Sequence, residues 1–161
     1  MDLLQHARDL YRAGRMHDAL EAAQAACDRA PKDAGAWWLL GLISRHTAMP
    51  AASDEAFRRA VELDHGLVLP VRVSGERFYA LVEEALAALP APAGGRPPAA
   101  AAFRVQPVPT ADQVRAGVDP DALTLREPAP HHPLVVFQVN HENRAGTEDA
   151  LRGLLRRSLS N

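Results

Sequence analysis

The residues that could carry out chemistry are few, and most of them lie in the second half of the chain. His141 and Glu142 form the only His-Glu pair, which is how the zinc-binding motif H-E-x-x-H begins. In that motif, two histidines one helical turn apart bind the metal and the glutamate activates its water. Ala145 stands where the second histidine is needed, so this pair does not make a zincin site.

A second possible metal site consists of His131, His132 and His141, which a folded-back loop could bring together. However, His131 and His132 stand directly before Pro133 in a Pro-rich loop, where histidines usually belong to a solvated turn. We therefore expect no bound metal and no cofactor. Zinc enters only under an alternative interpretation in which these three histidines form an unusual site.

The sequence also offers no clear candidate for a nucleophile or for a nucleotide-binding loop. Cys27, the only cysteine, lies in an Ala-rich stretch, where a thiol is expected to pack as a small hydrophobe. Gly94 and Gly95 are followed by Arg-Pro-Pro and not by the start of a helix, so they do not form a phosphate-binding loop. The residues thus favour a protein that is not an enzyme.

The composition narrows the class of partner. In 161 residues, 18 basic and 20 acidic side chains leave a net charge of −2, with no basic tract to neutralise a phosphate backbone. Nucleic acid is therefore not an expected partner. The N-terminus lacks the pattern of a signal peptide and the apolar runs are too short to cross a bilayer, so we expect a cytoplasmic protein without membrane contact.

A repeat of 34 residues organises the first part of the chain. The residues paired at this interval are Ala19 and Ser53, Ala26 and Ala60, and Pro31 and His65. The second segment resembles the tetratricopeptide repeat, whose pattern is W-x2-L-G, A, F, A and P, at Trp37, Leu40, Gly41, Ser53, Phe57 and Ala60. We expect two helical hairpins over residues 1–65, with helices near 2–13, 16–30, 34–47 and 51–64.

Small residues explain why such hairpins pack. Two antiparallel helices approach closely only where small side chains lie at the crossing, and Gly41, Ser53 and Ala60 are expected there. Two repeats alone are marginally stable, so a further helix should cover the second. The apolar pattern at 75–89, with Ser74 as N-cap, predicts one; residues 66–89 are either this cap or part of the C-terminal domain.

The second half is expected to be a small α+β region. Residues 90–102 are rich in Pro, Ala and Gly and predict a linker or loop. Within 103–161, the predicted elements are a strand at Phe103 to Val108, a helix at Ala111 to Ala116, a strand at Leu134 to Val139, and a final helix to Leu159 that Thr147 caps.

From Gly75 onward the chain resembles the small bacterial zincin-like metallopeptidases. The family's E-R-F-x2-L-V-E-E-A-L-x2-L-P helix is matched from Glu76 to Pro90, and its later segments at 119–123, 134–140 and 149–159. In the family, the last of these helices leads into H-E-x-x-H, and the sequence ends at Asn161, about where the first zinc-binding histidine would stand. The resemblance implies a zincin-like fold without its catalytic residues.

The tetratricopeptide resemblance implies a concave groove lined by the first helix of each repeat. The groove positions expected to contact a partner are Arg8, Tyr11, Arg12, Trp38, Leu42, Arg45 and His46, with Leu4 beside them. This mixture suits a short peptide with an apolar anchor and acidic flanks. Relatives that clamp a chaperone's C-terminal carboxylate use Lys and Asn where this chain has Leu4 and Arg8, so that role is disfavoured. In a competing interpretation, Trp38 and Leu42 pack internally against the 75–89 helix.

The sequence thus predicts a mainly α protein, with tetratricopeptide-like antiparallel helix pairs followed by a small α+β zincin-like domain. Its expected function is a non-catalytic bacterial scaffold for a protein or peptide partner. A second copy or a homologous family member could cover the surface near 134–159 that the missing zinc helix would leave exposed. The alternative is a zinc metallopeptidase, which a reading frame continuing past Asn161 into H-E-x-x-H would support.

Overall fold

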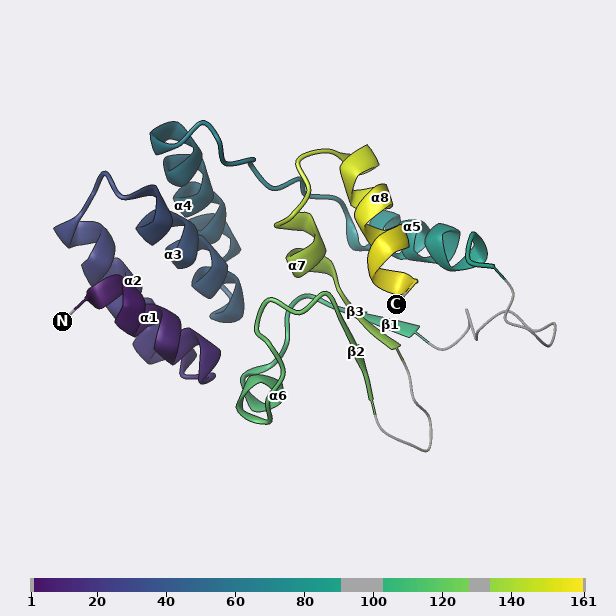
Figure 1. The fold of residues 1–161 in the computed structure, drawn as a ribbon, viewed down its shortest axis with the longest axis horizontal. Helices are drawn as coiled ribbons and strands as arrows, with labels where there is room; N and C mark the ends of the chain where they lie inside the picture. Colours follow the sequence, from purple (N-terminus) through teal and green to yellow (C-terminus); the bar gives the residue numbers. More distant parts are fainter. Residues whose placement is uncertain (1, 91–102, 128–133, 161) are drawn as a thin grey trace. The chain divides into compact units, whose positions relative to one another are not determined.

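The computed structural model describes residues 2–90, 103–127 and 134–160 (Figure 1). The chain divides into two compact units, of which unit 1 comprises Met1–Leu69 with Val108–Asp121, and unit 2 comprises Pro70–Pro107 with Ala122–Asn161. The described part is mainly helical, as the sequence predicted, and it contains one small mixed sheet. None of the helices in the described ranges is both long and apolar enough to cross a membrane.

Unit 1 is built on two helix pairs. Its helices are α1 (Leu3–Arg12), α2 (Met16–Arg29), α3 (Ala34–His46) and α4 (Pro50–Leu63), within one or two residues of the ranges expected from the sequence. Asp2 and Asp33 begin α1 and α3, because each side chain accepts hydrogen bonds from the free backbone N–H groups of the first turn. α1 packs on α2, α3 packs on α4, and α2 joins the pairs by packing on α3.

The crossing of α3 and α4 confirms the predicted role of small residues. A Cβ atom on Gly41 would lie 2.7 Å from the ring of Phe57, closer than side chains can approach. The hydroxyl of Ser53 donates a hydrogen bond of 2.6 Å to the Gly41 carbonyl oxygen, and Ser53, Phe57 and Ala60 are fully buried. Trp38 lies edge-on to Phe57, with ring centroids 4.6 Å apart. The helices therefore touch through a glycine backbone and an aromatic ring.

The described part of unit 2 contains the sheet and three helices. Its elements are α5 (Gly75–Ala87), β1 (Phe103–Gln106), β2 (Thr124–Arg126), β3 (Leu134–Phe137), α7 (Gln138–Glu142) and α8 (Glu148–Leu159). β3 is central, with β1 parallel and β2 antiparallel to it. All four residues of β3 are buried, which explains the continuous apolar run in its sequence.

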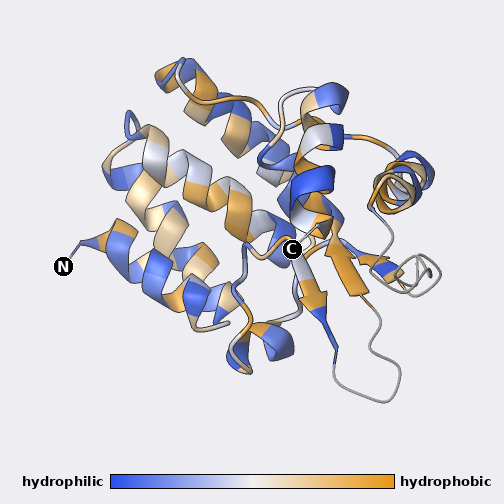
Figure 2. Ribbon diagram, turned by 45° about the vertical axis from the view of Figure 1, so that its right-hand side comes forward, coloured by the Kyte–Doolittle hydropathy of each residue, from blue (hydrophilic) through white to orange (hydrophobic). Residues whose placement is uncertain are grey.

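α5 and α8 pack on each other and on the sheet to form the core of unit 2. Figure 2 shows hydrophilic and hydrophobic residues alternating along the helices, as expected of amphipathic helices. The buried residues of this core include Phe78, Leu81, Val82, Val136, Leu151 and Leu155. The predicted caps are confirmed, because Ser74 accepts from the Arg77 N–H and Thr147 from the Ala150 N–H.

The second half departs from the expected elements in three ways. The strand expected at Leu134 to Val139 ends at Phe137 and continues as α7, while the strand expected to reach Val108 ends at Gln106. The pairing of β1 with β3 ends at Gln106 and Phe137, and the chain then continues as α7, with the Val139 N–H still bonded to the Pro107 carbonyl oxygen at 2.9 Å. β2, of three residues, was not expected. Finally, residues 108–121 belong to unit 1, whereas one α+β region over 103–161 was expected. α5 belongs to unit 2, which was one of the two alternatives for this helix.

Candidate functional site

The segment Val108–Asp121 forms part of unit 1 although it lies far from the helix pairs in sequence. It contains α6 (Ala111–Arg115), which begins with a reciprocal capping box between Thr110 and Gln113. Val114 is 3% exposed and joins the core formed by α1, α2 and α3. The helix pairs therefore hold this segment through an apolar anchor.

Gly14, in the turn between α1 and α2, lets α6 come close. A Cβ atom on Gly14 would lie 2.8 Å from Cγ of Arg115 and 3.0 Å from the Ala111 carbonyl oxygen. Gly14 also has φ +79°, a conformation that favours glycine. The Arg115 guanidinium donates a hydrogen bond of 3.3 Å to the Gly14 carbonyl oxygen. A side chain at position 14 would therefore disturb both the turn and the contact.

The end of the segment is held by a polar cluster of Tyr11, His46 and Asp121. The Tyr11 hydroxyl donates a hydrogen bond of 2.7 Å to Oδ1 of Asp121. It therefore accepts from His46, whose Nε2 lies 3.0 Å away, and this assigns the proton to Nε2. The two rings meet edge to face at 5.1 Å.

Burial favours the uncharged forms of Tyr11 and His46. It raises the pKa of Tyr11 well above its usual value, and the Asp121 carboxylate raises it further. It lowers the pKa of His46 to about 4, although the backbone carbonyls of Pro109 and Pro120 act in the opposite direction. Tyr11 and His46 are therefore neutral at pH 7, and Tyr11 acts as a hydrogen-bond donor to the carboxylate.

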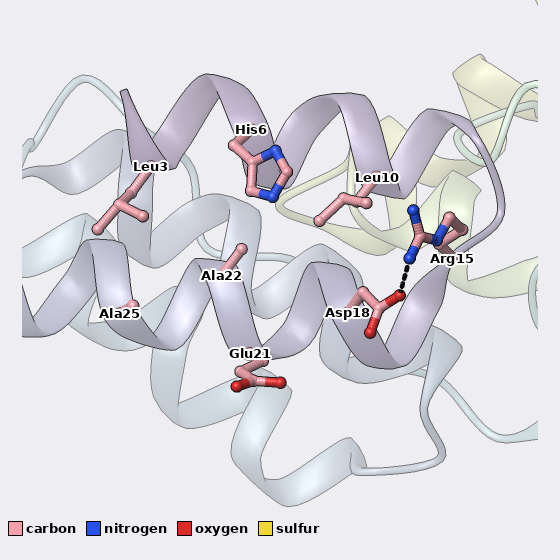
Figure 3. Close-up of a pocket in the computed structure, with 8 residues that line it drawn as sticks. All are labelled: Leu3, His6, Leu10, Arg15, Asp18, Glu21, Ala22 and Ala25. Carbon is pink, nitrogen blue, oxygen red and sulfur yellow. Dashed lines mark hydrogen bonds and ion pairs between the residues drawn. The ribbon is translucent and has the colours of Figure 1, made fainter. Parts of the chain in front are cut away.

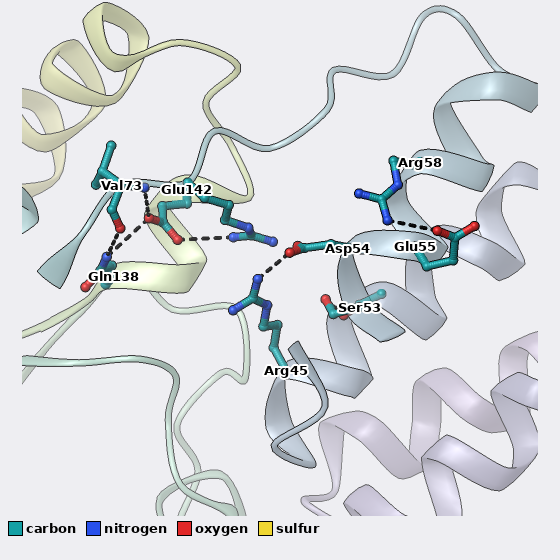
Figure 4. A network of polar contacts seen from close by, with 10 residues as sticks. Arg45, Ser53, Asp54, Glu55, Arg58, Val73, Gln138 and Glu142 are labelled. Carbon is teal, nitrogen blue, oxygen red and sulfur yellow. Dashed lines mark hydrogen bonds and ion pairs between the residues drawn. The ribbon is translucent and has the colours of Figure 1, made fainter. Parts of the chain in front are cut away.

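Two further expected groove residues are engaged within unit 1. The Arg45 side chain is 16% exposed and pairs with Asp54 of α4, with 2.9 Å between Nη2 and Oδ1 (Figure 4). Leu42 is half-buried and packs against the core of α1, α2 and α3. Because its charge is paired with Asp54, Arg45 does not add to the cationic character expected of the groove.

Arg8 and Arg12 remain available. Arg8 is half-buried and Arg12 exposed, and within the described ranges neither guanidinium has a hydrogen bond or ion pair. A Cβ atom on Gly35 of α3 would lie 3.9 Å from both Nη2 of Arg8 and Cδ2 of Leu4. Thus the Arg8 side chain reaches across from α1 to the start of α3. We call Leu4, Arg8, Arg12, Trp38 and Leu42 the α1–α3 surface.

A pocket that the sequence did not suggest lies between α1 and α2 (Figure 3). It has a volume of about 520 Å³ and is lined by Leu3, His6, Leu10, Arg15, Asp18, Glu21, Ala22 and Ala25. Arg15 and Asp18 form an ion pair of 2.5 Å across its rim. One arginine and two carboxylates thus line the pocket, and none of the groove residues expected from the sequence lies in it.

In unit 2, His141 is placed by structural hydrogen bonds. Its Nδ1–H donates to the Phe137 carbonyl oxygen at 2.8 Å, so Nε2 accepts from the Ser158 hydroxyl at 2.7 Å. A serine on a histidine is the arrangement of a nucleophile and its base. However, the ring is fully buried, and burial lowers its pKa to about 4, so it makes a poor base. His131 and His132 lie outside the described residues.

Glu142 joins two segments of unit 2 (Figure 4). Its side chain is 3% exposed and accepts hydrogen bonds from the Val73 N–H at 3.0 Å, from Gln138 at 3.2 Å and from Arg72 at 3.2 Å. A carboxylate with this set of donors is held in place and is not free to activate water. Cys27 is buried as predicted, and burial raises its pKa to about 11.

Comparisons of the chain with family models, with curated proteins and with solved structures gave no match. Among the residues described, no three His, Cys, Asp or Glu side chains are grouped so that they could hold a metal ion. The contribution of 108–121 to unit 1 was missed from the sequence. Its only local signal was the sequence Asp119-Pro120-Asp121, which predicts a turn but not its contact.

Proposed function

We propose that the chain is a non-catalytic protein-interaction scaffold, in which tetratricopeptide-like helix pairs bind an acidic peptide on the α1–α3 surface. One observation carries the proposal: Arg8 and Arg12 lie on one helix without ion-pair partners in the described ranges, beside apolar side chains. Unpaired guanidinium groups next to apolar side chains fit a peptide with an apolar anchor and carboxylate flanks.

The packing of unit 1 supports a rigid surface of this kind. Gly41 against Phe57, and Ser53 bonded to the Gly41 carbonyl, hold α3 against α4 at one separation. The hydrogen bond from Arg45 of α3 to Asp54 of α4 joins the same two helices. A preorganised surface binds a peptide with less loss of conformational entropy than a mobile one. The expected ligand is therefore a peptide that adapts to the protein.

For unit 2 we propose a zincin-like domain without peptidase chemistry. His141 and Glu142, its only His-Glu pair, are both buried in hydrogen bonds that stabilise the unit. This supports a structural role for the pair. The domain's expected contribution is to bind a second copy of the chain or a homologous protein, which light scattering of the purified chain would detect as a defined dimer or complex.

Fluorescence anisotropy tests the acidic-peptide site. The probe is a fluorescein-labelled synthetic peptide with one leucine flanked by glutamates, and its control has glutamines in place of the glutamates. We expect the full chain to prefer the glutamate peptide, and Arg8→Glu with Arg12→Glu to weaken its binding about tenfold or more, since each contact is charge-assisted.

The matched control exchanges two exposed arginines of α8, Arg156→Glu with Arg157→Glu, for the same change in net charge. This variant should retain binding, because α8 belongs to unit 2. Equal affinity for the glutamate and glutamine peptides, or equal losses in the two charge-reversal variants, would contradict the proposed site and indicate non-specific attraction.

A further inference from the structure

The 108–121 segment has the features of a bound peptide. Its backbone hydrogen bonds are largely its own, from Val114 N–H to the Thr110 oxygen, from Ala116 N–H to the Asp112 oxygen and from Val118 N–H to the Gln113 oxygen. The Asp121 N–H is bonded to the Asp119 side chain at 2.8 Å. The segment thus brings its own local structure, and it contacts the helices of unit 1 through side chains and, at His46, through the Pro109 and Pro120 carbonyls.

Side chains of the segment contact the helices of unit 1. Val114 is buried in the core of α1, α2 and α3, and Ala111 packs against this core. Arg115 donates to the Gly14 carbonyl oxygen, and Asp121 accepts from Tyr11. An apolar anchor with a carboxylate nearby is the chemistry that the sequence predicted for an external ligand of the groove. We call the residues that receive the segment, Tyr11, Gly14 and His46, the α6 site.

The α6 site needs an occupant. Without one, the phenol of Tyr11, now 3% exposed, and the apolar side chains around Val114 would face water. Yet α6 does not fill the site completely. A pocket of about 340 Å³ remains beside it, lined by Gly14, Arg15, Met16, His17, Asp18, His46, Ala111 and Arg115. This pocket is not lined by Val114, so it extends the α6 site beside Ala111 and Arg115.

We propose that the α6 site is a peptide-binding site that the chain fills with its own 108–121 segment, and that a partner peptide of the same chemistry binds by displacing it. The partner is an N-capped helical turn with one apolar anchor, followed by an aspartate that accepts from Tyr11. This inference rests on the proposed scaffold function, and adds to it that one site is blocked until its internal ligand leaves.

The test uses the full chain and a fluorescein-labelled synthetic peptide with the sequence of residues 107–122. In the variant Val114→Ser with Asp121→Asn, the internal segment loses its anchor and its carboxylate. We expect this variant to bind the peptide at least tenfold more tightly than the unmodified chain, in which the site is occupied. A control peptide carrying the same two substitutions should bind neither chain.

Tyr11→Phe, added to the Val114→Ser and Asp121→Asn variant, should weaken binding about tenfold, because the peptide carboxylate loses its donor. Circular dichroism first establishes that each variant retains its helices; if the double variant does not, Asp121→Asn alone replaces it. A folded variant that does not bind the peptide, or an unmodified chain that binds it equally well, would overturn the proposal.

Arg8→Glu with Arg12→Glu separates the two proposals. These substitutions should leave binding of the 107–122 peptide unchanged within about twofold, since the segment's hydrogen bonds to Tyr11 and Gly14 involve neither arginine. If the 107–122 peptide fails its test while the glutamate peptide binds as expected, only the internal-ligand proposal is overturned. If the glutamate peptide fails its test while the 107–122 peptide binds as expected, only the assignment of Arg8 and Arg12 is overturned.

Discussion

Tyr11 donates a hydrogen bond of 2.7 Å to the carboxylate of Asp121, which lies 110 residues further along the chain. The donor comes from the first helix and the acceptor from the segment between β1 and β2. The phenol is buried and also bonded to His46, and Asp121 is half-buried.

Tyr11→Phe removes the hydroxyl and leaves the ring in place. We expect the free energy of unfolding to fall by about 2 kcal/mol, because a hydrogen bond to a charged acceptor is lost and His46 loses its partner. Urea denaturation of the full chain measures the change. Tyr79→Phe is the control, since Tyr79 is 45% exposed, and should change the free energy by less than about 0.5 kcal/mol. Similar losses in the two variants would count against the role of Tyr11.

Gly41→Ala tests the close contact of α3 with α4. The added methyl group would lie 2.7 Å from the Phe57 ring, so the helices must separate or the ring must move. We expect a loss of about 1 to 3 kcal/mol, the usual effect of overpacking. Gly75→Ala is the matched control, because nothing lies within 4 Å of its added methyl group. There the better helix propensity of alanine should leave stability unchanged or raise it by up to about 1 kcal/mol. Thermal unfolding that ranks the two variants in the opposite order would exclude this packing.

The buried histidines predict a loss of stability in mild acid. Burial lowers the pKa of His46 and of His141 from 6.5 to about 4, so the unfolded chain binds more protons than the folded chain between these values. Their contribution is present above pH 6.5 and is lost as the pH falls toward 4. Each should contribute about 2 kcal/mol of destabilisation between pH 7 and pH 5.

Urea denaturation at pH 7, 6 and 5 measures this slope. His141→Gln should make the slope shallower, and His65→Gln, at an exposed position, should leave it as in the unmodified chain. Stability that is constant from pH 7 to pH 5 in the unmodified chain would show that neither buried ring is held neutral.

Glu142→Gln tests the buried carboxylate of unit 2. The amide group of glutamine would place a donor against the Val73 N–H, Gln138 or Arg72, which all donate to Glu142. We expect a loss of about 3 kcal/mol, because buried donors are left without an acceptor. Glu83→Gln, on an exposed position of α5, is the control and should be nearly neutral. If calorimetry shows that Glu142→Gln leaves stability unchanged, the carboxylate does not hold the 70–74 segment.

Local signals were enough to predict most of the helices. Ser74 and Thr147 are N-caps whose chemistry acts within three residues, and Gly41 and Ser53 act between neighbouring helices of one hairpin. α7 could not be predicted in this way, because the apolar run to Val139 favours a strand locally. It becomes helical where β1 no longer pairs with it, at Phe137, and that limit is set by the sheet.

The candidate site was predicted only in part. The tetratricopeptide resemblance implied that Tyr11 and His46 lie in one groove, and the structure brings their side chains together. It could not show that Asp121 would contact Tyr11, since nothing in either local sequence specifies a partner so distant in the chain. Nor could it show that Arg45 would be paired with Asp54 while Arg8 and Arg12 have no such partner in the described ranges.

A titration followed by nuclear magnetic resonance tests the central claim most directly. The ¹⁵N-labelled full chain is titrated with the unlabelled glutamate–leucine peptide, and the signals of the backbone and of the Trp38 indole are followed. The account predicts saturable shifts concentrated at 4–12 and 35–42, and their absence in the Arg8→Glu, Arg12→Glu variant. Shifts concentrated in unit 2, or equal shifts with the glutamine peptide, would contradict it.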